Sequence, residues 1–383
     1  MFALAAAAPA PSTPEPSFNR EAWKADFQKI KQGLAQGYAN LDWQVDRRGI
    51  NLARADGQIT AMLDKANSDV EAALILAKLV DAFHDPHLRL QIGPPPAGAT
   101  LLPMQSCVDQ PASSACGGPR YSNGKSATRL AYPQAQNWQP LAEGPFQSGL
   151  IDDVGFIRVP AFGEERYLSA CQRVARPGMD ARALQLATRA ELNREIRALI
   201  DTLRSRGMKK LVIDVTNNGG GSEWSNELAA MFGGGSLKRR APMLAKPSCD
   251  RSAVWRGERP CAIYGKEPEV ETMEGTGAWT GPLAVLADRR SASATEEFIT
   301  WLKDNKRAVV AGERTFGAGC GYVDGGYAIA LTAAPLHIMV PNCSRYTGEG
   351  LNEIEGIAPD VPVDWALVEA KDFAPLLARL FPS

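Results

Sequence analysis

The sequence predicts an α/β protein in which an N-terminal helical subdomain precedes a larger domain with a mixed sheet. Residues 19–91 show the spacing of apolar side chains that is typical of helices. Residues 150–383 instead alternate short apolar strands with amphipathic helices, a pattern that indicates a layered α/β domain with partly parallel pairing. Between them, residues 92–149 are rich in Pro, Gly, Ser and Gln, which indicates a loop-rich insert or linker.

Length and charge narrow the function classes. The 383 residues favour about two domains. The formal charge is −1 and no long basic run occurs, so we expect neither nucleic acid nor an anionic membrane as a partner. The chain has no apolar run near ~18 residues, so it predicts no membrane span.

The N-terminus and the cysteines predict an exported protein. Residues 1–18 resemble the end of a secretory signal followed by a disordered Pro/Ser linker; an Ala/Pro-rich stretch without a targeting role is the alternative. Local pairing of cysteines suits an oxidising compartment, so we expect a periplasmic or secreted location, with buried free thiols as the alternative. The expected disulfides are Cys107–Cys116, Cys249–Cys261 and Cys320–Cys343, with Cys171 free. The absence of a C-x-x-C motif argues against zinc.

The N-terminal subdomain has clear helix signals. The segment NREAWKADFQKIKQGLAQGYANLDW has helical apolar spacing. Ser68 and Glu71 form a capping box at the start of another helix. Pro86 disfavours helix at Asp85, so this helix ends at HDPH, and LRLQI then alternates like a strand.

In residues 150–383 the sequence patterns predict the following helices and strands, in chain order. GLIDDVGFIRVPAF predicts a hairpin and LNREIRALIDTLRSRG an amphipathic helix. KKLVIDV and GPLAVLAD are buried strands, followed respectively by the glycine loop TNNGGGSEW and by a serine turn that opens the helix ATEEFITWLKDN. RAVVAGE predicts a third buried strand, and YAIALTAAPLHIMVP predicts antiparallel strands. We find no internal repeats.

Ser293 is the candidate nucleophile. Its small neighbours in the turn SAS leave room for a substrate, and free N–H groups at a helix N-terminus suit an oxyanion. The plain alternative is a capping box, because Ser293 and Glu296 also form S-x-x-E.

Two further groups of residues could assist. Amides of Gly219, Gly220 or Gly221 could face an oxyanion; a plain glycine turn is the alternative, and no Lys-Ser/Thr follows to make a phosphate loop. Of the three histidines, His337 lies in an apolar strand and His84 near a helix end, whereas His87 follows a proline in a loop that could hold a functional side chain.

The order of these motifs resembles the family of tail-specific, or C-terminal-processing, serine peptidases. LVIDVTNNGGG, LAVLADRRSASATEEF, RAVVAGERTFGAG and EGIAPDVPV carry the resemblance, which touches most of residues 20–366 outside the insert. It implies a ClpP/crotonase-like β-spiral catalytic domain with Ser293 as nucleophile. Many members carry a PDZ module, but the insert is short and lacks strand patterning, so we assign none.

The base departs from the processing branch of that family. The branch pairs its serine with a lysine in TFGKG, whereas this chain has TFGAG with Ala318. A second branch resembles the tricorn protease core and uses an upstream histidine oriented by a glutamate near the G-[VI]-x-P-D motif. The resemblance therefore implies His87 as base and Glu353 as its orienter. Glu296 is a rival orienter because it lies one helical turn from Ser293, but we expect its main role to be the capping box.

We therefore expect a serine peptidase that acts on a peptide or protein through a Ser293 acyl-enzyme, without metal or cofactor. The amides of Ala294 and Gly220, or Gly219, would hold the oxyanion. A non-catalytic peptide- or lipophile-binding protein on the same fold is the alternative from another class, and an esterase using the same serine is the third possibility.

Overall fold

The computed structural model describes residues 18–95, 116, 121–124, 127–142, 144–245, 250–258, 261 and 269–382. The helices in these residues are α1 (Arg20–Gly37), α2 (Leu41–Asp46), α3 (Leu52–Leu63), α4 (Asp69–Asp81), α5 (Leu168–Val174), α6 (Ala181–Ser205), α7 (Trp224–Met231), α8 (Ala294–Asp304) and α9 (Phe373–Leu380). The strands are β1 (Arg89–Ile92), β2 (Gln139–Ala142), β3 (Ser148–Ile151), β4 (Val154–Arg158), β5 (Lys210–Asp214), β6 (Gly234–Arg240), β7 (Met243–Leu244), β8 (Val270–Thr276), β9 (Leu283–Ala287), β10 (Val309–Gly312), β11 (Tyr327–Ala330), β12 (Leu336–Val340), β13 (Cys343–Ser344) and β14 (Val361–Pro362). In the part of the chain described, no helix has the length and apolar character needed to span a membrane.

A mixed seven-stranded sheet lies at the centre of the larger part of the molecule, and helices pack on it. This arrangement confirms the predicted α/β fold class. The strand order of the sheet is β14-β10-β9-β5-β4-β3-β2. The strands from β14 to β4 pair in parallel, and β4, β3 and β2 pair antiparallel. The expected hairpin is β3–β4, and the three expected buried strands are β5, β9 and β10.

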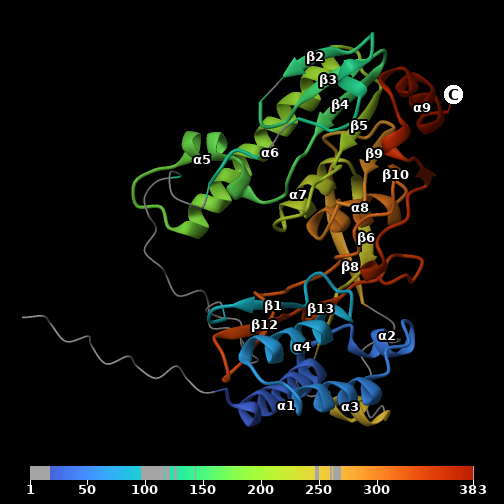
Figure 1. The fold of residues 1–383 in the computed structure, drawn as a ribbon. Helices are drawn as coiled ribbons and strands as arrows, with labels where there is room; N and C mark the ends of the chain where they lie inside the picture. The colour runs from blue at the N-terminus through green and yellow to red at the C-terminus, as the bar shows by residue number, and fades with distance from the viewer. Residues whose placement is uncertain are drawn as a thin grey trace, which may run out of the picture.

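Helices cover both faces of this sheet (Figure 1). Ile213 and Val285 pack in one core with side chains of α6, α7 and α8. Val212 and Leu286 point the other way and pack with α9. Because adjacent side chains of a strand alternate between faces, strands buried on both sides have the continuous apolar sequences seen here.

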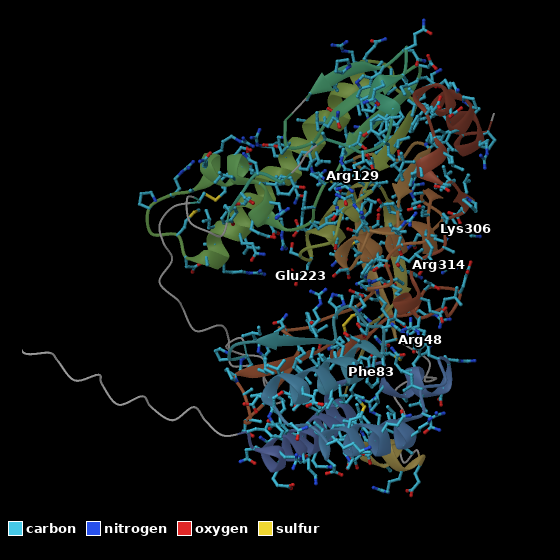
Figure 2. The ribbon with its side chains drawn as sticks, viewed as in Figure 1. Arg48, Phe83, Arg129, Glu223, Lys306 and Arg314 are labelled. Carbon is cyan, nitrogen blue, oxygen red and sulfur yellow. A yellow bond between two sulfur atoms is a disulfide. The ribbon has the colours of Figure 1, made fainter. Side chains whose placement is uncertain are left out.

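The N-terminal helices share a second core with strands from the far end of the chain. β1 pairs antiparallel with β12, which pairs with β11. Ile329 of β11 and Ile338 of β12 lie in one cluster with side chains of α1, α3 and α4 and with Phe83, which is labelled in Figure 2. The predicted Ser68 cap begins α4, since the Ser68 hydroxyl accepts the Glu71 N–H at 3.2 Å, although the Glu71 carboxylate accepts the N–H of Asn67 at 3.0 Å and not that of Ser68. The segment that carries His87 is thereby fixed to the C-terminal half of the chain.

The cysteine pairing differs from the expectation at one bond. Cys320 pairs with Cys343 as expected, but Cys116 pairs with Cys171, so the predicted Cys107–Cys116 bond and the free Cys171 were wrong. The start of α5 brings Cys171 into a small apolar cluster with Cys116 across 55 residues of chain, and sequence nearness does not report such contacts. Cys261 is also disulfide-bonded, and its partner lies outside the described residues, as do Cys107, Cys249 and the expected leader up to residue 17.

Candidate active site

Three loops meet at the carboxyl edge of the parallel strands. They follow β5, β9 and β10, and parallel strands place their carboxyl ends at one edge of a sheet. The Ala292 N–H donates to the carbonyl of Asn218 at 3.0 Å, which joins the first two loops. The Phe316 N–H donates to the carbonyl of Ser291 at 3.0 Å, which joins the third.

Ser293 stands at this junction in a strained backbone conformation. Its φ is 57° and its ψ is −120°, close to the first central position of a type II′ turn, which glycine normally occupies. An ordinary N-cap residue has extended backbone angles. Capping alone therefore does not account for the conformation, and strain of this kind concentrates at functional sites.

The glycine loop packs directly against Ser293. A Cβ at Gly220 would lie 2.8 Å from the Ser293 Cβ and 2.9 Å from the Ala294 nitrogen, and Gly220 has φ +97°, so no other residue fits there. The Gly220 N–H, expected to hold the oxyanion, donates instead to Asn218 Oδ1 at 2.9 Å. The N–H groups of Ala294 and Gly219 donate to no acceptor among the described residues.

Glu296 ties the nucleophile turn to the third loop. Its buried carboxylate accepts the Ser293 N–H at 2.9 Å, the Thr315 hydroxyl at 2.6 Å, and the N–H groups of Gly317 and Ala318 at 2.8 and 2.7 Å. Burial, together with the nearby charge of Glu353, raises the pKa of Glu296 to about 7, although the hydrogen bonds from Thr315, Gly317 and Ala318 favour the anion. The predicted capping box is present, and it extends beyond the helix to the loop that contains Ala318.

His87 lies on the opposite side of this third loop. Its ring meets the Tyr322 ring edge to face, with centroids 5.1 Å apart, and a Cβ at Gly321 would lie 2.6 Å from the imidazole. Burial lowers the pKa of His87, Asp85 raises it and Arg89 lowers it, with a net decrease. Among the described residues the ring makes no hydrogen bond to Ser293 or Glu353.

The loop after β10 spans the interval between Ser293 and His87. Ala318 bonds to the carboxylate that holds Ser293, and Gly321 touches the imidazole. Three residues extend at most about 11 Å. The fold therefore brings the distant His87 segment to the neighbourhood of Ser293, with no hydrogen bond between the two among the described residues.

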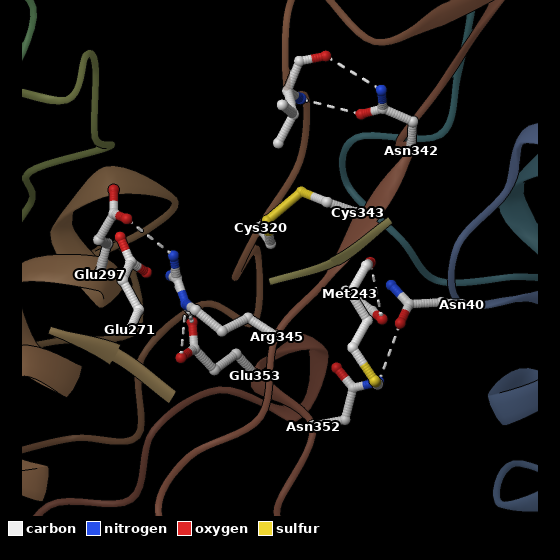
Figure 3. Close-up of a disulfide and its surroundings, with 12 residues drawn as sticks. Asn40, Met243, Glu271, Glu297, Cys320, Asn342, Cys343, Arg345, Asn352 and Glu353 are labelled. Carbon is white, nitrogen blue, oxygen red and sulfur yellow. Dashed lines mark hydrogen bonds and ion pairs between the residues drawn. A yellow bond between two sulfur atoms is a disulfide. The ribbon is translucent and has the colours of Figure 1, made fainter. Parts of the chain in front are cut away.

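Glu353 occupies a different position from the one expected. Its fully buried carboxylate accepts from Arg345 Nε at 2.8 Å (Figure 3). It also accepts from the Thr300 hydroxyl at 2.9 Å. Arg345 also pairs with Glu297 at 3.0 Å, and these carboxylates raise the pKa of the guanidinium despite its burial. Among the described residues no hydrogen bond joins Glu353 to His87, because a buried guanidinium attracts the carboxylate more strongly than a neutral ring. The role of Glu353 as orienter of His87 stays a prediction.

Comparison with known proteins places the chain in a family. The model of peptidase family S41 matches residues 153–363, more than half of the chain. The chain belongs to peptidase family S41. The matched residues contain the glycine loop, Ser293, the Ala318 loop and Glu353, whereas His87 lies upstream of them.

Relatives of this S41 chain are similar over shorter stretches. It is 32% identical to the chloroplastic C-terminal processing peptidase of Tetradesmus obliquus over 171 residues, 42% of this chain and 30% of the relative. It is 24% identical to the tail-specific protease of Haemophilus influenzae over 186 residues, 48% of this chain and 24% of the relative. The chain thus spans less than a third of the length of these curated relatives.

The fold of the chain is similar to that of a solved structure over nearly its whole length. The structure of mature CPAF complexed with lactacystin matches 94% of this chain and 97% of its own, with a TM-score of 0.61 and 15% identity. At that identity the match shows a common fold.

Three residues near the S41 site were missed in the sequence. Asp85 binds the His87 N–H, and its place two residues before a histidine, across a proline, is a signal that could have found it. Arg345 and Thr315 gave no such signal, because their importance comes from partners distant in sequence. His337 is structural as predicted, since its ring bonds to the Gly93 carbonyl at 2.8 Å.

Proposed function

We propose that this chain is a serine peptidase in which Ser293 is the nucleophile and His87 the general base. The observation that carries the proposal is the strained Ser293 at the start of α8, with Gly220 packed on its Cβ and a free Ala294 N–H beside it. A hydroxyl so placed is exposed to a substrate carbonyl, and an unused amide stands where negative charge develops.

The reaction follows from these positions. Ser293 Oγ attacks a peptide carbonyl while His87 takes its proton. The oxyanion of the tetrahedral intermediate receives hydrogen bonds from the N–H groups of Ala294 and Gly219. Protonated His87 then gives its proton to the leaving amine, and water attacks the acyl-enzyme by the same route.

The proposal requires the imidazole of His87 to approach Ser293 when substrate binds. Catalytic hydrogen bonds are often long without substrate and tighten in the Michaelis complex. The ring packs on Gly321 and Tyr322, and it makes no hydrogen bond to any residue that the structure describes. Its lowered pKa favours the neutral form that a base needs.

The compartment we propose is the periplasm or the cell exterior. Two disulfides, Cys116–Cys171 and Cys320–Cys343, support an oxidising location. The second bond adjoins the loop that separates Ser293 from His87, so the proposed catalytic geometry depends on oxidised thiols.

Peptide cleavage tests the proposal. The full chain is incubated with a library of unstructured peptides and with simple esters, and products are identified by mass spectrometry. We expect amide cleavage that Ser293→Ala abolishes. Ester hydrolysis without amide cleavage would instead support an esterase, and peptide binding without turnover would support the binding protein.

A further inference from the structure

We propose that Asp85 is the positioning residue that holds His87 and sets its charge state. This inference rests on the proposed role of His87 as base. It assigns to Asp85 the task that the family resemblance gave to Glu353.

Asp85 holds His87 through the backbone. Its Oδ1 accepts the His87 N–H at 2.9 Å, across Pro86, whose ring restricts the chain between them. Its Oδ2 accepts the hydroxyl of Tyr38 at 2.9 Å, and Tyr38 is fully buried and also bonded to Gln44. Asp85 as a whole is only 7% exposed, so these two hydrogen bonds fix its carboxylate in one position.

Tyr322, in the loop after β10, holds the carbonyl end of His87. The Tyr322 hydroxyl donates to the His87 carbonyl while its ring packs on the imidazole. Asp85 thus fixes the N–H and Tyr322 the carbonyl of the same residue. The imidazole can turn about its side-chain bonds, but its backbone cannot move away from the loop that leads to Ser293.

The charges around His87 come from few groups. Asp85 and Arg89 lie on its own segment, and Tyr322 faces it from the loop after β10. Tyr38 stands behind Asp85, and burial keeps its pKa well above the usual range, so it is a neutral donor. Arg48, labelled in Figure 2, donates to the Phe83 and His84 carbonyls at 3.0 and 3.3 Å. Among these groups Asp85 supplies the negative charge, which opposes the effects of burial and Arg89 on His87.

Glu353 cannot supply this charge in the arrangement described. Arg345 contacts both of its oxygens, and the Thr300 hydroxyl takes a further lone pair. Its charge is therefore already neutralised by a buried cation.

Ring titration by NMR tests the inference on the full chain. The protein has three histidines, and His87→Ala identifies the His87 signal. The midpoint of His87 is compared in the wild type, Asp85→Asn and Arg89→Gln, with Asp81→Asn as a control that removes a carboxylate from the exposed end of α4. Asp85→Ser is a second neutral variant, because a serine hydroxyl can accept the same N–H.

We expect Asp85→Asn and Asp85→Ser to move the His87 midpoint to lower pH, Arg89→Gln to move it to higher pH, and Asp81→Asn to leave it in place. The acidic limb of kcat/KM should move in the same directions. An unchanged midpoint in a folded Asp85 variant, or an equal shift in Asp81→Asn, would overturn the inference. The titration needs no turnover, so a midpoint that shifts in an inactive protein would refute the peptidase proposal and leave the Asp85–His87 link intact.

Discussion

Ser293 adopts a backbone conformation that its side chain does not favour, and its neighbours maintain it. Glu296 binds its N–H, and Gly220 packs on its Cβ from the adjacent loop. A conformation of this kind costs on the order of 1–3 kcal/mol, so the surrounding contacts must exceed that cost. The strain places the hydroxyl at the edge of the sheet, where a substrate can reach it.

Replacement of Ser293 should reveal the strain. Ser293→Gly removes both the hydroxyl and the steric penalty, so we expect it to be more stable than Ser293→Ala by about 1–2 kcal/mol. Chemical denaturation of the two inactive variants measures the difference. Equal stabilities would show that φ is not positive at this residue in solution.

The pH dependence of activity reports His87. A base must be neutral, and burial lowers the pKa of this imidazole, so activity should rise with pH and reach half its maximum below the ordinary value of 6.5. The measurement is kcat/KM against pH for the wild type and for His84→Ala, whose side chain is exposed. A single limb well above the histidine range, unaffected in its position by Asp85→Asn, would point to another base.

The sequence predicted Ser293 and His87 by type and by family pattern, but it could not give their partners. Asp85 was visible only as a residue at the end of a helix, and Glu353 as the orienter that the family resemblance implied. The fold brings together segments that lie hundreds of residues apart in the sequence. Their arrangement decides that Asp85 lies beside His87 and that Glu353 binds Arg345. Arg345, eight residues before Glu353, decides the matter, and nothing in its sequence context indicates burial.

At the scale of elements, the loop from Thr315 to Tyr322 connects the two halves of the site. It bonds to Glu296 at one end and contacts His87 at the other. The Cys320–Cys343 disulfide anchors its middle to β13. A covalent bond therefore helps to fix the loop between Ser293 and His87, the proposed nucleophile and base.

Removal of that bond should lower both stability and activity. Cys320→Ser/Cys343→Ser opens a loop that spans 23 residues, which costs about 3 kcal/mol in the chain-entropy account. We also expect a loss of kcat, because Gly321 and Tyr322 lose their anchor beside His87. The matched control is Cys116→Ser/Cys171→Ser, whose bond lies beside α5. If both pairs reduced kcat equally, the loop would have no special role.

Elements with strong local signals were predictable, and those set by distant contacts were not. The Ser68 cap and the apolar strands β5, β9 and β10 carry their information within a few residues. The Cys116–Cys171 bond depends on where α5 lies, and a free Cys171 was the expectation because no cysteine is near it in sequence. The same limit applies to the pairing of β1 with β12, which joins residues far apart in the chain.

At the scale of the whole molecule, the two parts of the chain are joined by a shared core and by a buried ion pair. Arg251 is fully buried and bonds to Asp42 at 2.6 Å, and also to the carbonyls of Ala35 and Tyr38. Burial lowers the pKa of Arg251, and Asp42 opposes that effect. The α1–α2 region that supports Tyr38, and through it Asp85, is thus fixed to the segment at residues 251–256, which packs in the N-terminal core.

Loss of this ion pair should destabilise the protein strongly. Asp42→Asn leaves the buried guanidinium without its counter-charge, and we expect a decrease in the free energy of unfolding of about 3–5 kcal/mol. The control is Asp56→Asn, which breaks a partly exposed pair with Lys31 and should cost less than about 1 kcal/mol. Urea denaturation measures the free energy of unfolding of both variants. Similar decreases in the two variants would show that the Asp42–Arg251 pair is not buried in solution.

The most direct test of the account is covalent labelling of Ser293 by a fluorophosphonate probe. The oxidised full chain should react at Ser293, as peptide mapping by mass spectrometry would show, because we propose that His87 activates its hydroxyl beside the N–H groups of Ala294 and Gly219, which donate to no acceptor in the described part of the chain. His87→Ala should label far more slowly than His84→Ala, its matched control, while both stay folded. Absence of labelling in the folded wild type, or equal labelling rates in the two histidine variants, would contradict the assignment of Ser293 and His87 as nucleophile and base.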